Sequence, residues 1–272
     1  MSPHPHPRRR RLAFAAFVCV VAGVLMAMVI TGEAGVTATP APASTRAAGP
    51  LPLAAEQQPA PPRGCRYRPR TTSVRSGPAG RRRVALTFDD GPTSYTSRIL
   101  DLLEGERVPA TFFVVGRKVA GREDLLLRML RDGHMIANHS YTHVDLSKAS
   151  AAALRQIDDT QDAIKAATGF TPCLLRPPYG RTSRKLLGAL ARRHLTGTLW
   201  SVNPRDFLRP GTAAISQRVL DGVRPGSIIL AHDGGGDRSQ TVAALPSIIA
   251  TLKARGYTFV TVTELLGLRV TR

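Results

Sequence analysis

Acidic residues are scarce in this chain of 272 residues: 19 aspartates and glutamates stand against 38 lysines and arginines, so the formal net charge is +19. Aromatic residues are also few, at 5% of the chain. No stretch combines basic and aromatic residues as a nucleic-acid reader motif would, so nucleic acid is not an expected partner. The positive charge instead favours an anionic membrane or cell-wall surface.

Cysteine is nearly absent too, with three residues. Cys19 lies in a long apolar run, which leaves Cys65 and Cys173 as the only cysteines outside it. An even pair in an exported protein is typical of a disulfide. Two unrelated buried thiols are the alternative; of the two, we predict the disulfide.

Charge is missing altogether from Leu12 to Ile30, directly after Arg8–Arg11. These 19 residues are long for the hydrophobic region of a signal peptide and about enough to span a bilayer. The basic flank orients the N-terminus inside the cell and the remainder outside. We therefore expect a basic cytoplasmic segment at 1–11 and a single-pass signal-anchor at 12–31, with a cleaved signal peptide and secretion as the alternative.

The segment after the apolar run is rich in proline, alanine, threonine, serine and glutamine, with almost no hydrophobic periodicity. It cannot bury enough apolar surface to order itself, so we expect a Pro/Ala-rich linker at 32–63. A folded domain is expected at 64–272. Its first residues, 64–83, are rich in arginine and are expected to form a loop that straps against the domain through Cys65.

From Val84 onward, short apolar runs alternate with amphipathic stretches, and no internal repeat is visible. Strands that are each followed by a helix-like segment predict an α/β barrel in preference to an open sheet. In such a barrel the reacting groups gather at the carboxyl ends of the strands. Seven strands are expected, at 84–88, 110–115, 133–137, 173–176, 196–201, 227–231 and 257–260. Helices are expected at 94–105, 119–132, 149–168, 182–193, 212–222 and 239–254, with a last segment at 261–267.

Two adjacent carboxylates follow the first of these strands, in Asp89-Asp90-Gly91-Pro92. Buried side by side they would repel each other, and loss of solvation would raise their pKa values. A metal ion on one carboxylate and an arginine on the other would keep both ionised. A plain turn between strand and helix is the alternative, but the rest of the chain contains the missing partners.

Two histidines four residues apart, His139 and His143, follow the strand at 133–137. Histidines at this spacing can bind one metal ion from a tight loop. Surface or capping histidines are the alternative. Together with Asp90 they would supply three protein ligands and leave a position for water or substrate, which is typical of a catalytic zinc site.

Arg176 follows another apolar run and precedes Pro177-Pro178-Tyr179-Gly180. The prolines hold the backbone extended and rigid. An arginine before them could reach an ionised carboxylate and fix its orientation. A surface turn is the alternative, since these residues are common in loops.

Asp206 and His232 form the last candidate pair. His232 ends the strand at 227–231 and would open into the mouth of the barrel, where a histidine paired to Asp206 would serve as a general acid. A core histidine with satisfied hydrogen bonds is the alternative. Phe207, next to Asp206, could line a groove of the size of a sugar.

Five segments, TFDDGP, HSYTH, RPPYG, NPRDF and LAH, resemble in order and spacing the five motifs of the polysaccharide deacetylase family, which is carbohydrate esterase family 4. The resemblance covers about Arg83 to Leu266. It implies the NodB homology fold, a distorted (β/α)₇ barrel, and metal-dependent removal of an acetyl group from an N-acetylated sugar.

The resemblance also implies roles for the matching residues. It makes Asp89 the general base, held by Arg176, and it makes His232 the general acid, tuned by Asp206. It implies Zn²⁺, with Co²⁺ as the other option, on a ligand set of Asp90, His139 and His143.

The resemblance further implies that the backbone N–H of Tyr179 stabilises the oxyanion and that Leu230 lines the pocket for the acetyl methyl group. The fourth motif departs from the family: Asn203 stands where aspartate is common, and Phe207 where tryptophan is usual. The second change keeps an aromatic wall but loses an indole N–H, which affects substrate preference more than catalysis. The expected substrate-contacting residues are Pro177, Tyr179, Trp200, Phe207 and Leu230.

We therefore predict an extracytoplasmic, monomeric hydrolase that removes acetyl groups from N-acetylglucosamine residues of a cell-wall polysaccharide. Peptidoglycan is the first choice because of the membrane anchor and linker, and chitin-type oligosaccharide is the second. An O-acetyl esterase acting on xylan or another acetylated glycan is one alternative. A carbohydrate-binding barrel without catalytic activity is another, although every expected catalytic position is occupied.

Overall fold

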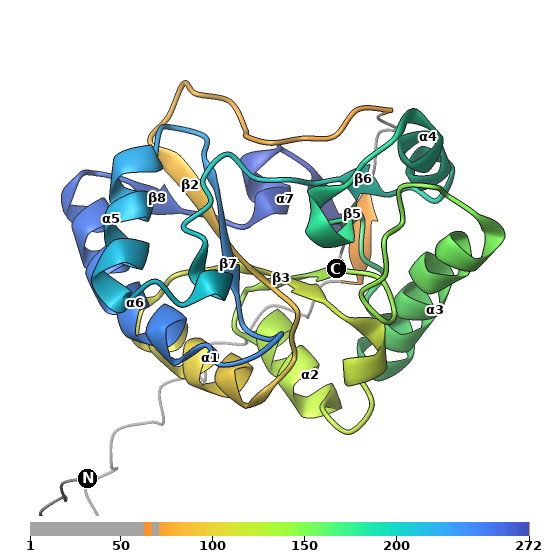
Figure 1. Ribbon diagram of the computed structural model, residues 1–272, viewed down its shortest axis with the longest axis horizontal. Coiled ribbons are helices and arrows are strands. Elements are labelled where there is room, and N and C mark those ends of the chain that lie inside the picture. The colour runs from red at the N-terminus through yellow and green to blue at the C-terminus, as the bar shows by residue number, and fades with distance from the viewer. Residues whose placement is uncertain (1–62, 67–70, 272) are drawn as a thin grey trace, which may run out of the picture. The chain divides into compact units, whose positions relative to one another are not determined.

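The computed structural model describes residues 63–66 and 71–271 (Figure 1), and all structural statements concern these residues. The expected basic segment at 1–11, the signal-anchor at 12–31 and the linker up to residue 62 lie outside the described residues. Within the described ranges, no helix combines the length and the apolar character needed to cross a bilayer.

A parallel sheet forms the centre of the domain, and β2 (Arg83–Asp89) is the strand with the most neighbours in it. β2 pairs with β3 (Thr111–Val114) on one side and with β7 (Ile228–His232) on the other, and its first residues also pair with β8 (Thr258–Phe259). Beyond β3 the sheet continues through β4 (Met135–Asn138), β5 (Leu174–Leu175) and β6 (Thr196–Gly197). All seven strands are found at their expected places, but β4 begins two residues later than expected and β6 ends four residues earlier, so the prediction is confirmed for the positions of the strands and only partly for their lengths.

The sheet curls, but its hydrogen-bonded path stays open between β6 and β7. Beyond β6, Val202 accepts a backbone hydrogen bond from Leu230 of β7 (2.9 Å), which narrows this seam. Residues 71–82, which we call the strap, fill part of the remainder: Val74 N–H donates to the carbonyl of Gly197 (2.8 Å). The expected barrel is therefore a curled half-barrel whose open side is bridged by the strap.

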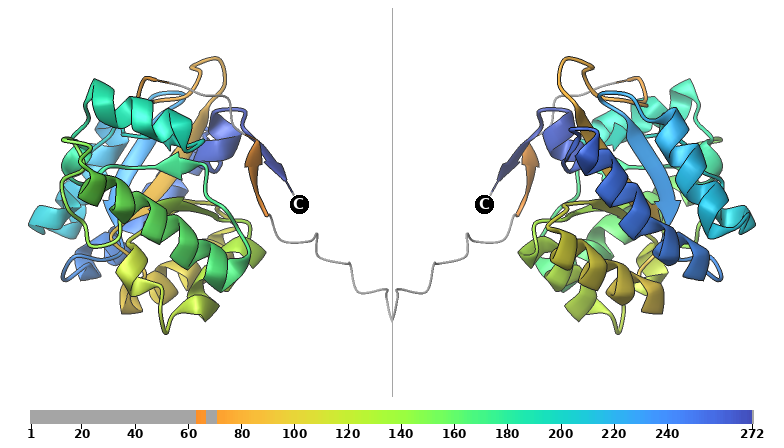
Figure 2. Two further views of the ribbon diagram at one scale, coloured as in Figure 1. Left: turned by 90° about the vertical axis from the view of Figure 1, so that its right-hand side faces the viewer. Right: turned by 90° about the vertical axis from the view of Figure 1, so that its left-hand side faces the viewer.

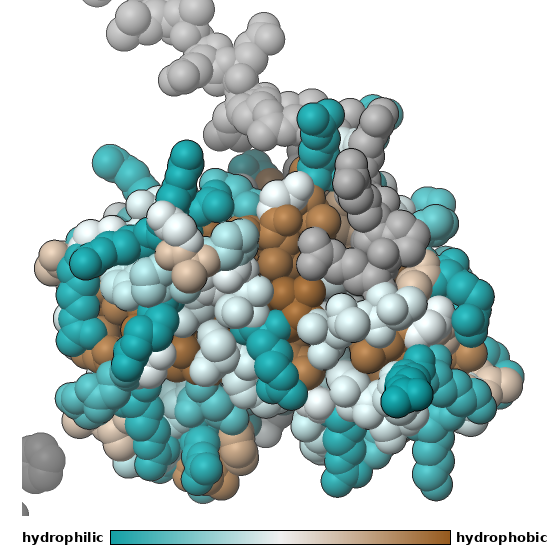
Figure 3. Space-filling view, turned by 90° about the horizontal axis from the view of Figure 1, so that it is seen from above, coloured by the Kyte–Doolittle hydropathy of each residue, from teal (hydrophilic) through white to brown (hydrophobic). Residues whose placement is uncertain are grey.

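The face that carries the strap is shown in Figure 3, where hydrophilic side chains project around a strip of hydrophobic residues. Arg75, Arg81 and Arg82 of the strap are exposed. Part of the excess positive charge therefore lies on the surface beside the seam.

Helices lie around the outside of the curled sheet (Figure 2). Thr93 begins the first of them with a capping box, because its side chain accepts from Tyr95 N–H while its own N–H donates to Thr96. Three helices begin a few residues later than expected, because the preceding residues form turns and N-caps. The α-helices are α1 (Ser94–Glu106), α2 (Glu123–Arg131), α3 (Ala151–Thr168), α4 (Arg184–Arg192), α5 (Thr212–Gly222), α6 (Ser239–Ala254) and α7 (Val262–Leu265). Three 3₁₀ turns are η1 (Gly116–Lys118), η2 (Pro178–Gly180) and η3 (Asp206–Leu208).

Alternation along β2 decides which side chains face the interior of the half-barrel. Leu86 and Phe88 belong to the large core between sheet and helices, whereas Ala85 belongs to a separate cluster on the inner side. Because successive side chains of a strand point to opposite faces, Thr87 and Asp89 share the inner side with Ala85. The strand thus presents its terminal carboxylate to the inside of the fold.

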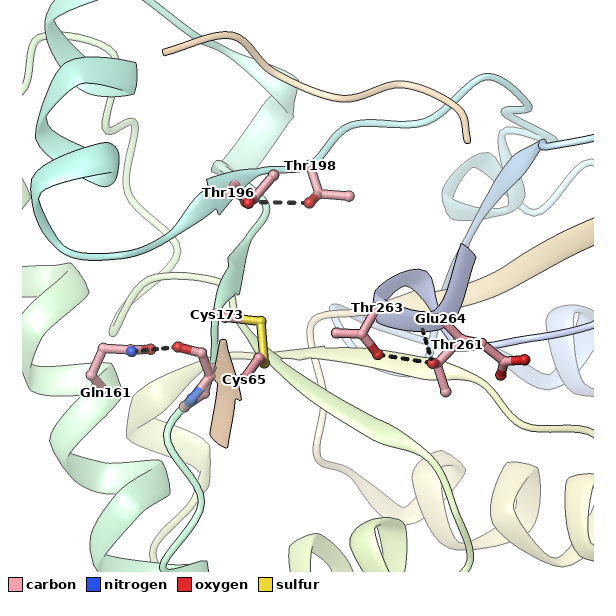
Figure 4. Close-up of a disulfide and its surroundings, with 9 residues drawn as sticks. Cys65, Gln161, Cys173, Thr196, Thr198, Thr261, Thr263 and Glu264 are labelled. Carbon is pink, nitrogen blue, oxygen red and sulfur yellow. Dashed lines mark hydrogen bonds between the residues drawn. A yellow bond between two sulfur atoms is a disulfide. The ribbon is translucent and has the colours of Figure 1, made fainter. Parts of the chain in front are cut away.

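A second, two-stranded sheet was not expected from the sequence. β1 (Gly64–Arg66) pairs antiparallel with β9 (Arg269–Thr271), so the start of the domain is joined to its end. Cys65 of β1 forms a disulfide with Cys173, just before β5, and the two Cα atoms lie 5.7 Å apart (Figure 4). The segment before the strap is therefore fixed beside the strand that leads to Arg176.

Candidate active site

Asp89 and Arg176 form a buried ion pair at the carboxyl end of β2. Arg176 Nη1 donates to Asp89 Oδ1 (2.6 Å) and to Thr87 Oγ1 (2.9 Å), and Nη2 donates to the carbonyl of Leu199 (3.1 Å). Arg176 is 0% exposed and its guanidinium lies 4.0 Å from the centre of the Phe113 ring, which favours the cation through its quadrupole. Burial lowers the pKa of Arg176, and the charge and hydrogen bond of Asp89 oppose that effect. The pair holds the Asp89 carboxylate in one orientation.

Asp90 turns away from its neighbour because it leaves the strand with a left-handed φ of 75°. Its Oδ1 lies 3.4 Å from Nε2 of His139 and 3.2 Å from Nε2 of His143. Asp90 Oδ1 is buried and has no hydrogen-bond partner among the described residues. The second carboxylate oxygen of Asp89, Oδ2, lies 3.8 Å from the same His139 nitrogen. One oxygen and two nitrogens thus converge on a single point beside Asp89.

The histidine loop after β4 is folded so that both rings face this point. His139 Nδ1–H donates to the carbonyl of Arg176 (2.7 Å), an acceptor only, which leaves the lone pair of Nε2 free. Ser140 N–H donates to the Asn138 side chain, and the Ser140 hydroxyl accepts from His143 N–H. These bonds hold Ser140 and His143 in left-handed conformations, with φ values of 63° and 65°.

The pKa shifts of Asp90 and His143 favour the forms of these two side chains that bind a cation. Burial raises the pKa of Asp90, but the nearby His139, His143 and His232 lower it by more, so the net pKa is lowered. Burial lowers the pKa of His143 more than the charge of Asp90 raises it. An ionised carboxylate and neutral imidazoles are the donor set that suits zinc. Asp90, His139 and His143, with ligand atoms within 4.8 Å of one another, therefore fit a metal ion.

A second acid–base pair lies on the opposite side of the site. His232 Nδ1 hydrogen-bonds Asp206 Oδ1 (2.7 Å), and Asp206 Oδ2 accepts from His232 N–H (2.9 Å) and from the Thr241 hydroxyl (2.9 Å). Burial lowers the pKa of His232, but the hydrogen bond and charge of Asp206, with the charges of Asp89 and Asp90, raise it above its ordinary value. Nδ1 is committed to Asp206, so proton exchange with a ligand falls to Nε2.

A pocket of about 500 Å³ connects these groups. Arg176 and Asp206 do not line the pocket, but they hydrogen-bond to Asp89 and His232, which do. Tyr179 and Phe207 form its rim, with 63% and 46% of their surfaces exposed. Tyr179 has a left-handed φ of 61°. In this turn Gly180 N–H donates to the carbonyl of Pro177, so the N–H of Tyr179 takes no part in that hydrogen bond. The sequence-predicted residues that line the pocket are Asp89, Asp90, His139, His143, Pro177, Tyr179, Trp200, Phe207, Leu230 and His232.

Several residues of the site had no predicted role. Lys118 Nζ donates to the backbone carbonyl of Asp90 (2.6 Å), and Asn138 organises the histidine loop. Asp233 is buried and accepts from Thr96; burial and the charges of Asp90 and Asp89 raise its pKa to about 7. Arg238 lines the pocket. The only sequence signal for Asn138 and Asp233 is that each adjoins a predicted site histidine.

The fold and site together define a class: a half-barrel of βα units whose mouth holds a carboxylate, a three-residue metal cluster and a histidine–aspartate pair has the parts of a metal-assisted hydrolase. The family model for polysaccharide deacetylases matches residues 76–197. The chain is 43% identical over 195 residues to a chitooligosaccharide deacetylase of Bradyrhizobium sp. (strain ANU 289), an alignment that covers 66% of this chain and 88% of the relative.

Two further comparisons agree. The chain is 41% identical over 188 residues to a peptidoglycan-N-acetylglucosamine deacetylase of Bacillus cereus, with 67% of this chain and 87% of the relative covered. The crystal structure of a peptidoglycan N-acetylglucosamine deacetylase superposes with a TM-score of 0.70 at 35% identity, over 73% of this chain and 94% of the other. The chain belongs to the polysaccharide deacetylase family, and it is a hydrolase that acts on carbon–nitrogen bonds.

Proposed function

We propose that this protein is a metal-dependent deacetylase that hydrolyses the acetamide of N-acetylglucosamine residues in a cell-wall glycan. The observation that carries the proposal is the meeting of Asp89, the cluster of Asp90, His139 and His143, and His232 in one pocket. The named relatives, which are chitooligosaccharide and peptidoglycan deacetylases, support this class of substrate.

Zn²⁺, or Co²⁺ in its place, is the proposed ion on Asp90, His139 and His143. A divalent cation held there supplies Lewis-acid polarisation of an acetyl carbonyl and of a water molecule. His139 is oriented for this role by its hydrogen bond to the Arg176 carbonyl (2.7 Å), and Asp90 by the contact of Lys118 with its backbone (2.6 Å).

Asp89 is the proposed general base. Its Oδ1 is held by Arg176 (2.6 Å), and its Oδ2 faces the cluster, 3.8 Å from His139 Nε2. A carboxylate with one oxygen fixed and the other directed to the attacking water can take the water's proton without moving. The backbone N–H of Tyr179 is the proposed donor to the oxyanion that then forms.

His232 is the proposed general acid. An amide nitrogen leaves poorly unless it is protonated, and His232 Nε2 faces the pocket while Nδ1 is held by Asp206 (2.7 Å). The raised pKa of His232 keeps a larger fraction of the ring protonated near neutral pH. Replacing His232 by alanine is expected to lower turnover by about 10²- to 10⁴-fold.

The remaining proposed roles concern the substrate and the cell. Leu230 would contact the acetyl methyl group, and Pro177, Trp200, Tyr179 and Phe207 would form the sugar-binding walls. A monomer outside the cytoplasm, anchored by the N-terminal segment or secreted, fits a cell-wall glycan as substrate.

Acetate release by the purified protein tests the proposal. The substrates are chitohexaose, peptidoglycan and acetylated xylan, each assayed after chelation and after addition of zinc or cobalt. We expect metal-dependent acetate release from at least one of the first two, and loss of it in His232→Ala. Release from acetylated xylan alone would identify an O-acetyl esterase instead. No release from any substrate by fully metal-loaded protein would favour the carbohydrate-binding barrel.

A further inference from the structure

Arg238 is a pocket-lining cation that the proposed chemistry does not use. It lies between β7 and α6, at the N-cap position of α6, and only 4% of its surface is exposed. The pocket that it lines is the one that holds Asp89, Asp90 and His232. A nearly buried guanidinium is costly unless it is held by hydrogen bonds or meets an anion, so its partners indicate its purpose.

The loop before α6 holds this guanidinium by one side. Arg238 Nε donates to the carbonyl of Gly234 (2.7 Å) and Nη2 donates to the carbonyl of Gly235 (2.9 Å). Within the described ranges, Nη1 donates no hydrogen bond, and this nitrogen is not fully buried. The guanidinium is therefore held by neutral acceptors, Nη1 remains without a hydrogen bond in the described part of the chain, and Arg238 is one of the residues that line the pocket.

The surroundings of Arg238 favour an anion. The first turn of α6 contains no acidic residue, so the positive end of the helix dipole adds to the charge of Arg238. Asp237, the adjacent acid, already accepts from the Tyr95 hydroxyl (2.8 Å) and from Ser239 N–H (2.9 Å). Arg209, 60% exposed, lies 3.8 Å from that same carboxylate.

Among the described residues, Arg238 forms no ion pair with Asp89 or Asp90, and both of these carboxylates contact other partners. Asp89 is paired with Arg176 (2.6 Å), and Asp90 Oδ1 faces the two histidines of the metal cluster. Gly235 separates Asp90 from Arg238: a Cβ atom at this glycine would lie 2.5 Å from Asp90 Oδ2 and 3.5 Å from Arg238 Nη2. Arg238 thus remains beside the reacting centre with one unsatisfied, positively charged donor.

We propose that Arg238 binds a carboxylate carried by the sugar next to the N-acetylglucosamine residue that is deacetylated. This inference rests on the proposed function and narrows its substrate class. Chitin-type chains carry no carboxylate, whereas the lactyl group of an N-acetylmuramic acid residue does when it is not amidated. Arg238 therefore selects a glycan of alternating neutral and lactyl-bearing sugars over a uniform chitin-type chain.

A matched pair of substrates tests this without changing the sugar backbone. One is a tetrasaccharide of alternating N-acetylglucosamine and N-acetylmuramic acid with free lactyl carboxylates, and the other is the same tetrasaccharide with these groups converted to amides. For the zinc-loaded parent protein we expect kcat/KM to be about 10- to 100-fold higher on the carboxylate form, the value of one charge-assisted hydrogen bond.

Two variants separate recognition from structure. Arg238→Gln keeps a hydrogen-bond donor but removes the charge, and it should bring the carboxylate-to-amide ratio close to one; Arg238→Lys should restore part of the preference. Arg155→Gln on the outside of α3, where Arg155 is exposed, changes the net charge equally and should keep the parent ratio. Zinc content, measured for every protein, shows whether the metal cluster is intact.

Two results would overturn the inference: a parent protein that does not distinguish the two tetrasaccharides, or an Arg238→Gln variant that loses activity on both in equal proportion. The second result would mean that Arg238 only stabilises the loop that contains Gly234 and Gly235. Calorimetric binding of both tetrasaccharides is measured in parallel. If the zinc-loaded parent protein releases acetate from neither tetrasaccharide nor from chitohexaose, the proposed function fails, while the difference in binding still decides the role of Arg238.

Discussion

Replacing Asp89 by asparagine should destabilise the domain as well as stop turnover, because Arg176 would lose its counter-charge in a place that water does not reach. Arg176 is 0% exposed, and its Nη1 lies 2.6 Å from the Asp89 carboxylate. Removing one member of a buried ion pair costs about 3–5 kcal/mol. For a domain of this size each kcal/mol lowers the melting temperature by about 2–4 °C, so the expected decrease is roughly 6–20 °C.

The assay is thermal and urea unfolding of metal-free protein, so that altered metal affinity does not enter the comparison. Arg176→Met and the double variant complete a cycle, in which the coupling should be about 1–3 kcal/mol, with the double variant more stable than the two single losses predict. Asp158→Asn is the matched control. Asp158 also pairs with an arginine at 2.7 Å, Arg193, but both side chains are partly exposed, and its loss should cost at most about 1 kcal/mol. If Asp89→Asn is no less stable than Asp158→Asn, the buried pair does not hold the base as argued.

The remaining predictions concern the metal cluster and a histidine outside it. Asp90→Asn should weaken zinc affinity, with activity partly rescued by excess zinc, whereas Asp89→Asn should keep its zinc and still fail to turn over; equal zinc loss in both, measured by metal analysis, would contradict this division. Gly235→Ala should lower zinc affinity by about 10- to 100-fold, because its Cβ would press on Asp90 Oδ2. Gly121→Ala is its control, since Gly121 has the same φ of 75° but nothing within 4 Å of the added carbon, and unchanged zinc affinity in Gly235→Ala would refute the contact. Burial lowers the pKa of His134 from 6.5 to about 4, so the folded state resists its protonation and stability should fall as the pH decreases from 6.5 to 4, by about 3 kcal/mol in total. His134→Gln should remove that part of the pH dependence, and a parent protein whose urea midpoint is the same at pH 7 and pH 4.5 would refute it.

The strands of the main sheet could be predicted because each is a run of apolar residues that ends at a polar or turn-forming segment. β1 and β9 could not, since three residues have no periodicity and Gly64-Cys65-Arg66 contains nothing that favours a strand over a loop. The open seam was also beyond prediction. Val74 meets Gly197 through backbone atoms alone, and backbone pairing leaves no trace in side-chain pattern.

The residues of the site also divide into those that the sequence could place and those that it could not. Asp89, Asp90 and the two histidines could be placed together because the carboxyl ends of parallel strands converge. Lys118 could not, because it contacts a backbone carbonyl of Asp90 from a turn that no motif marks. Arg238 was hidden for a similar reason: its partners are the carbonyls of two glycines, and one more arginine in a basic chain carries no signal.

The disulfide also determines how a pulling force would travel through the domain. Tension applied upstream of Cys65 passes through the bridge to Cys173, 108 residues further along the chain, and the intervening covalent path carries none of it. The strap lies on that unloaded path, so its backbone bond at Val74 is shielded from peeling. Reduction of the bridge would reverse this. Once β1 had separated from β9, the force would run along the strap and load the seam of the half-barrel.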